Sequence, residues 1–258
     1  MKNKIVISVS VIIIFIAIQF LAYFYGYVIF GKENWNAMDI NLKLSILKYS
    51  QIALVFFVTF ILLKKLPFEA LGLKKDLLKG LLYGFIFVLP MFIGYGIQNN
   101  FHAEFSISLF HKDIVLAGFF EEFTFRGFLF GILFYYCGWG FITAVLIPSV
   151  LFGMGHLYQA GDLAESISVF LFTALGGAGF AWLYMAWGSL WMVIFLHGFM
   201  DLAWDMFSTQ SGNVTGNLYA NIFRFTTLGL AIYFTRKKAK AENRLSLKGR
   251  LWVNKEVV

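Results

Sequence analysis

One apolar stretch of the sequence contains three charged side chains. Between residues 114 and 136 only Glu121, Glu122 and Arg126 carry a charge, and nearly all the other residues are apolar or aromatic. A charged side chain at the centre of a bilayer costs about 2.5 to 3.5 kcal/mol on insertion scales, so such residues face a bundle interior or a water-filled cavity. These three charges therefore mark a candidate functional site within a membrane.

The spacing of the three charges separates them into a pair and a single group. Glu122 and Arg126 are four residues apart, so on a helix they lie one turn from each other and can form an ion pair. Glu121 is rotated by about 100° from Glu122 around the helix axis. We therefore expect Glu121 to remain unpaired and to point into a cavity.

Two later apolar segments add further ionisable groups. His156 follows Phe152 by four residues, and His197 precedes Asp201 by four residues. Together with Glu121 they supply one carboxylate, two imidazoles and a second acid from three different helices. A set of this kind can activate a water molecule.

Two chemistries fit these residues. In the first, Glu121 acts as a general base, His156 orients the water, and His197 with residue 201 donates hydrogen bonds to a developing oxyanion. In the second, Glu121, His156 and His197 bind a zinc ion, because two histidines and a glutamate with an open position form a known catalytic zinc site. The sequence leaves both open, since it has no HExxH motif and the candidate ligands come from separate helices.

The composition predicts a membrane protein. Of the 258 residues, 60% are hydrophobic and 14% are charged, against about 25% charged in an ordinary soluble domain. The net charge of +7 comes from basic residues that flank apolar segments, which argues against a nucleic-acid-binding surface. The single cysteine, Cys137, can form no internal disulfide, and no cysteine and histidine cluster predicts a structural zinc.

The apolar segments predict an all-α polytopic membrane protein with about eight transmembrane helices in one bundle. The predicted spans are residues 1–30, 49–63, 81–97, 114–136, 141–156, 163–187, 190–207 and 218–234. Basic residues at the N-terminus, between the second and third spans and in the tail all fall on one face, so both termini are expected in the cytoplasm. We expect a single membrane domain, 1–258, with a basic cytoplasmic tail at 236–258.

Three motifs occur in order on successive apolar segments: Glu-Glu-x-x-x-Arg at 121–126, Phe-x-x-x-His at 152–156 and His-x-x-x-Asp at 197–201. This pattern resembles the CAAX protease and bacteriocin-processing (CPBP, Abi) family, which includes the CAAX prenyl endopeptidases. The resemblance covers a protease core at 115–207. It implies an all-helical intramembrane endopeptidase that cuts near the C-terminus of lipidated or membrane-bound proteins, with its active site between the fourth, fifth and seventh helices.

The resemblance also implies a role for each motif residue. Glu121 becomes the glutamate that activates water and His156 becomes its partner, while His197 and position 201 become the pair that stabilises the oxyanion. Glu122 and Arg126 match the second glutamate and the arginine of the motif, for which we expect a supporting role. The family has been described both as metal-dependent and as using glutamate without a metal. We favour the second description and expect no cofactor, with zinc on Glu121, His156 and His197 as the alternative.

Asp201 departs from the prenyl endopeptidase pattern, which has Asn at this position, whereas many bacterial relatives also have Asp. An asparagine side chain can donate a hydrogen bond, whereas an ionised aspartate only accepts. Asp201 can therefore assist an oxyanion only when it is protonated. Otherwise we expect it to orient His197 or to bind a cation.

Two other functions are compatible with the same residues. Intramembrane acids and histidines can relay protons in a coupled transporter, although no inverted repeat is visible in the sequence. A non-catalytic family member, acting in bacteriocin immunity or as a scaffold, would bind a peptide in the same cavity. As partners we expect a peptide or lipidated protein substrate and membrane lipids, and no nucleic acid.

Overall fold

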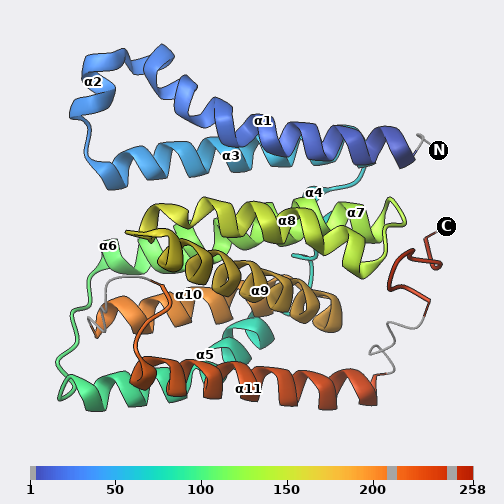
Figure 1. Cartoon of the computed structure of the whole chain (residues 1–258). Coiled ribbons are helices and arrows are strands. Elements are labelled where there is room, and N and C mark those ends of the chain that lie inside the picture. Colours follow the sequence, from blue (N-terminus) through green and yellow to red (C-terminus); the bar gives the residue numbers. More distant parts are fainter. Residues whose placement is uncertain (1–3, 208–213, 243–248, 258) are drawn as a thin grey trace.

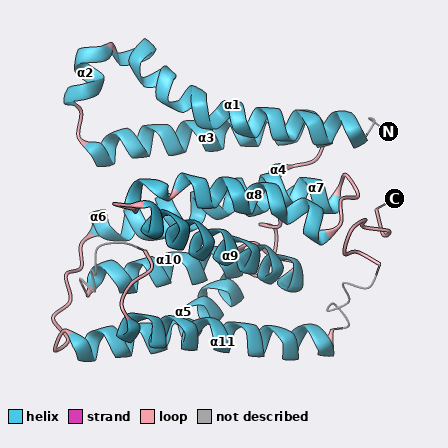
Figure 2. Cartoon of the chain, in the orientation of Figure 1, coloured by secondary structure: helices cyan, strands magenta, loops and turns pink. Residues whose placement is uncertain are grey.

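The computed structural model describes residues 4–207, 214–242 and 249–257, and they are almost entirely helical (Figure 2). The only extended pairing in this part of the chain is an isolated bridge between Trp139 and Val253. The helices are α1 (Lys4–Phe30), α2 (Lys32–Ala37), α3 (Ile40–Leu63), α4 (Pro67–Ala70), α5 (Leu77–Gln98), α6 (Ile107–Phe110), η1 (His111–Phe119), η2 (Glu122–Phe130), α7 (Gly131–Tyr135), α8 (Phe141–Gly155), η3 (Leu157–Gln159), α9 (Leu163–Trp187), α10 (Trp191–Met206) and α11 (Leu218–Ala241). The all-helical fold predicted from the sequence is confirmed.

The long helices lie side by side in layers (Figure 1). Helices α1 and α3 form a hairpin on one side of the bundle, and α5 packs with α11 on the other. Between them lie η1, η2, α8, α9 and α10, with α10 packed against both α5 and η1 and with α8 packed against α9. The described ends of the chain lie at the same end of the bundle, called the terminal end below.

Several of the long helices have the length and composition of membrane spans. Within the described residues, four helical segments are long and apolar enough to cross a membrane: Ile40–Leu63, Leu77–Gln98, Phe141–Gln159 and Leu163–Trp187. The eight apolar segments predicted from the sequence lie in helices apart from a few terminal residues, and residues 1–3 fall outside the described part. The chain is thus an integral membrane protein, and its eight crossings and the orientation of its termini stay predictions.

Helix α3 begins nine residues earlier than the sequence pattern suggested, at Ile40 and not at residue 49. Asp39 explains the early start, because its carboxylate accepts hydrogen bonds from the backbone N–H groups of Asn41 and Leu42 and so caps the helix. Lys48 consequently lies within a helix and not in a polar connection. This difference changes the candidate site.

Two glycines allow η1 and α10 to approach closely. A Cβ atom on Gly118 would lie 2.8 Å from the Cα of Gly198 and 2.8 Å from the carbonyl oxygen of Ile194. Only glycine fits at such a backbone contact, since real Cβ atoms do not approach that closely. The contact fixes how far His197 lies along the bundle relative to Glu122.

Two described segments of the C-terminal region lie against the bundle. Helix α11 extends to Ala241, and the segment 249–257 docks on the turn before α8. There Gly140 donates its N–H to the carbonyl of Trp252, at 3.1 Å, and the Asn254 amide donates to the carbonyl of Phe134, at 2.9 Å. The predicted basic tail, 236–258, is therefore helical at its start and docked near its end. Residues 243–248 and 258 of this tail lie outside the described residues.

Candidate functional site

Glu122 is a buried acceptor that joins two helices. Its side chain is fully buried, and one carboxylate oxygen, Oε1, lies 3.0 Å from Nη1 of Arg126 and 2.7 Å from Nδ1 of His197. The predicted pair of Glu122 and Arg126 is confirmed. The contact with His197 was not predicted, and it makes Glu122 the residue that fixes the Nδ1 side of that imidazole ring.

Arg126 is enclosed by aromatic rings and backbone. Its Nε lies 3.4 Å from the carbonyl oxygen of Gly177, and its guanidinium carbon lies 4.3 Å from the ring centre of Phe152 and 5.6 Å from that of Phe180. Gly177 provides the necessary space, because a Cβ there would lie 3.0 Å from Nη2 of Arg126. A buried cation in such a setting is stabilised by its carboxylate partner and by the faces of the rings.

Glu121 contacts a different helix from its neighbour, because its carboxylate is paired with a residue of α3. As predicted, the two adjacent carboxylates diverge, but Glu121 is not unpaired: its Oε1 lies 3.1 Å from Nζ of Lys48. Both side chains are partly exposed, Lys48 by 25% and Glu121 by 20%. The sequence interpretation missed Lys48 because it began the second span at residue 49 and so left Lys48 in the polar connection before it. The Asp39 cap was the one local signal that could have extended the helix to include it.

His156 lies immediately after the last residue of α8. Its Nδ1 lies 2.8 Å from the carbonyl oxygen of Phe152, an atom that only accepts, so Nδ1 carries the proton of the neutral ring. Nε2 then keeps its lone pair for another partner. The ring centre of Phe152 lies 4.4 Å from that of His156 and 6.4 Å from that of His197, so this phenylalanine packs near both histidines and also covers Arg126.

His197 lies between two carboxylates. Besides the Nδ1 contact with Glu122, its Nε2 lies 3.3 Å from Oδ2 of Asp201, one turn further along α10. The Asp201 side chain is 41% exposed, so this carboxylate forms the open side of the arrangement. The geometry favours orientation of His197 as the role of Asp201, one of the alternatives left open by the sequence.

The described residues include no group of three or more His, Cys, Asp and Glu side chains that could hold a metal ion. The zinc alternative uses Glu121, His156 and His197. In this structure both ring nitrogens of His197 face carboxylate oxygens, so neither nitrogen is directed at a shared ligand position. The residues present therefore do not fit a three-ligand zinc site in the arrangement described here.

A second charged cluster lies on the same face of α10. Lys112 contacts the carboxylate of Asp205, and its Nζ lies 3.5 Å from Oδ1 of Asp113. Asp113 precedes the apolar run that begins at residue 114, and burial raises the pKa of its carboxyl to about 7. The charge of Asp205 contributes to this rise in pKa, whereas Lys112 opposes it.

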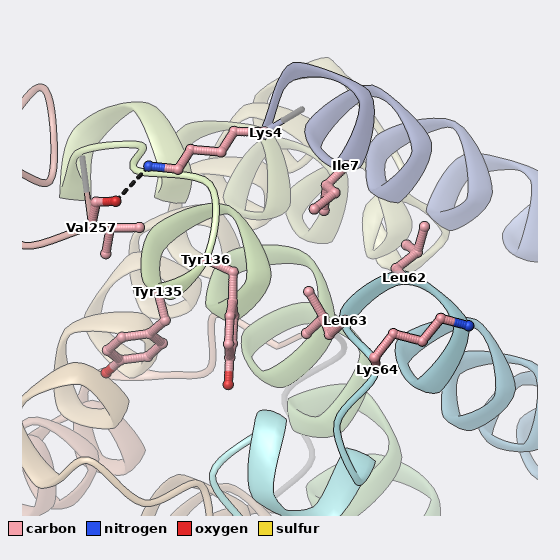
Figure 3. A pocket seen from close by; sticks show the side chains of 8 residues that line it. All are labelled: Lys4, Ile7, Leu62, Leu63, Lys64, Tyr135, Tyr136 and Val257. Carbon is pink, nitrogen blue, oxygen red and sulfur yellow. Dashed lines mark hydrogen bonds between the residues drawn. The ribbon is translucent and has the colours of Figure 1, made fainter. Parts of the chain in front are cut away.

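A cavity of about 370 Å³ lies at the terminal end, away from all of these residues (Figure 3). Its walls are the aliphatic side chains of Ile7, Leu62 and Leu63 with the rings of Tyr135 and Tyr136. Lys4, Lys64 and Val257 complete the lining, and Lys4 donates a hydrogen bond to the carbonyl of Val257. The cavity contains none of the candidate catalytic residues.

One part of the chain matches a known protein family. Residues 104–203 match the family model described as Rce1-like, type II CAAX prenyl endopeptidase Rce1-like. This segment is a CAAX-protease-type domain. It includes all six site residues predicted from the motifs, whereas Lys48 lies outside it. No curated protein and no solved structure matches the chain.

Proposed function

We propose that this protein hydrolyses a peptide bond of a membrane-bound or lipidated substrate with water activated by Glu121. The CAAX-protease-type domain supports an intramembrane peptidase at the level of the family. The observation that carries the finer proposal is the environment of Glu121. This partly exposed carboxylate is paired with Lys48 and lies within electrostatic reach of both His156 and His197.

The first step is attack by water. The Lys48 ammonium stabilises the ionised carboxylate of Glu121, which accepts a proton from a water molecule. His156 keeps the lone pair of Nε2 available to orient this water, because its Nδ1 proton is held by the Phe152 carbonyl. The oxygen of the water then bonds to the carbonyl carbon of the substrate, and the carbonyl electrons move onto its oxygen.

The second step is collapse of the tetrahedral intermediate. The negative oxygen is stabilised by a hydrogen bond from the Nε2–H of His197. The contact of this N–H with Asp201 is long, at 3.3 Å, so the N–H can also donate to the substrate oxygen. Glu122 holds the other side of the ring. Glu121 returns its proton to the amide nitrogen, the C–N bond breaks, and the products are a carboxylic acid and an amine. This scheme requires no metal ion.

The test uses the full chain purified in detergent and a library of lipidated and unmodified peptides, with cleavage sites identified by mass spectrometry. Glu121→Gln and His156→Ala are expected to lose at least 100-fold in kcat/KM, within the usual range for general acid–base groups. Glu69→Gln is the matched control, because Glu69 is an exposed carboxylate in the short helix α4 and is paired with Lys74. It should cleave like the parent.

Three results would overturn the proposal in distinct ways. Absence of cleavage by the parent, combined with peptide binding, would indicate a non-catalytic scaffold. Ion flux in liposomes that depends on Glu121, without cleavage, would indicate a transporter. Activity that is lost with a chelator and restored by zinc would replace the metal-free scheme with metal-assisted hydrolysis.

A further inference from the structure

The two ends of the bundle differ in charge. The segments at the terminal end are the start of α1, residues 64–79, the end of α11 and residues 249–257 (Figure 1). They carry Lys4, Lys64, Lys65, Lys74, Lys75, Lys79, Arg236, Lys237, Lys238, Lys240, Arg250 and Lys255, against four acidic residues, Glu69, Asp76, Glu242 and Glu256. The segments at the opposite end are α2, the starts of α3 and α11, residues 99–113, residues 156–165 and the end of α10 (Figure 1). They carry five basic residues, Lys32, Lys43, Lys48, Lys112 and Arg224, against eight acidic residues, Glu33, Asp39, Glu104, Asp113, Asp162, Glu165, Asp201 and Asp205. Because cytoplasmic segments of membrane proteins are enriched in Lys and Arg, this difference places the terminal end in the cytoplasm.

The candidate site lies in the half of the bundle that is remote from the terminal end. Helix α8 starts at the terminal end and runs for 15 residues, so His156, just after its last residue, lies about 22 Å along the helix axis. Helix α10 also starts at the terminal end, and Asp201 and Asp205 lie in its last two turns. Lys48 is in the first half of α3, which runs towards the terminal end.

The exposed side chains of the site also lie towards the end of the bundle opposite the terminal end. Asp201 is 41% exposed, and the short helix η3 after His156 carries Tyr158, which is 82% exposed. The side chain of Lys112 at the start of η1 is also 47% exposed. Charged side chains that are this exposed require water or lipid headgroups, because the hydrocarbon core does not solvate them. The site therefore has its aqueous opening at the acidic end of the bundle.

We infer that the site opens on the extracytoplasmic face of the membrane. If the proposed function holds, this orientation means that the substrate is a peptide segment exposed at the outer surface of the membrane. The substrate is then not the C-terminus of a prenylated protein in the cytosol. The orientation itself rests only on the charge distribution and on the position of the site along the helices.

The orientation is tested by labelling in intact cells that express the full chain. The parent is the blank, because its single cysteine, Cys137, is buried. Tyr158→Cys reports on the site, and Lys74→Cys, at a side chain that is 62% exposed, reports on the basic end. With a membrane-impermeant maleimide, we expect Tyr158→Cys to be labelled in intact cells and Lys74→Cys only after permeabilisation.

The reverse pattern would overturn the inference, and so would labelling of both variants or of neither in intact cells. This measurement does not depend on catalysis. If the labelling is as expected and no peptide is cleaved, the proposed function fails while the orientation stands. If the labelling is reversed and cleavage depends on Glu121, the proposed function stands and the site opens to the cytosol.

Discussion

Replacement of Glu122 by leucine should destabilise the protein strongly. The pair of Glu122 and Arg126 is almost wholly buried, with side chains 0% and 2% exposed. Removal of one partner of such a pair leaves an uncompensated buried charge, which costs about 3 to 5 kcal/mol. Arg126 would retain only the distant Gly177 carbonyl and the ring faces. We expect the free energy of unfolding to fall by this amount in Glu122→Leu.

Removal of both charges should restore stability but not activity. In the double variant Glu122→Leu/Arg126→Met no buried charge of this pair remains, so we expect it to regain at least about 2 kcal/mol over the single variant. The Nδ1 of His197 still lacks its acceptor at 2.7 Å. We therefore expect kcat for peptide cleavage to stay at least about 10-fold below that of the parent in both variants.

The assay is reversible unfolding in mixed micelles, followed by tryptophan fluorescence, together with peptide cleavage at saturating substrate. Glu69→Leu is the control, because its pair with Lys74 is exposed on both sides and should contribute about 0 to 1 kcal/mol. A double variant as unstable as Glu122→Leu would refute the reasoning on the buried charge. Full activity in the double variant would refute the positioning of His197 by Glu122.

Three further outcomes follow from the same geometry. Lys48→Met should reduce kcat at least about 10-fold with little change in KM, because the proposed mechanism requires a cation beside Glu121. Lys48→Arg keeps the positive charge and should recover most of the lost kcat. Equal kcat in the parent and in Lys48→Met would contradict this role of Lys48. Gly118→Val should lower the free energy of unfolding by about 1 to 3 kcal/mol in the same unfolding assay, because the added carbon atoms would clash with α10. An unchanged free energy of unfolding would show that η1 and α10 can move apart to accommodate the side chain. The raised pKa of Asp113, about 7 against an ordinary 3.8, means that the folded protein keeps a proton that the unfolded chain loses. Stability should therefore fall as pH rises from about 4 through 7, and melting curves of Asp113→Asn should show a weaker dependence; identical pH profiles would contradict the assignment.

The sequence was sufficient for everything that depends on the local geometry of a helix. The apolar segments predicted an all-helical membrane protein, and the four-residue spacings predicted that Glu122 would contact Arg126 and that Asp201 could orient His197. These contacts join side chains one turn apart, so the backbone repeat decides them. The order of the motifs likewise identified the family that the comparison then matched.

Only the tertiary structure decided which helices supply the partners. Lys48 lies 73 residues from Glu121, and Glu122 lies 75 residues from His197, so neither contact follows from a helical repeat. Both depend on how the helices approach, above all where Gly118 meets Gly198. The adjacent carboxylates were expected to diverge and do so, but Glu121 was expected to be unpaired. Its ion pair shows why that expectation failed: a helix repeat gives the direction of a side chain, whereas packing decides what lies there.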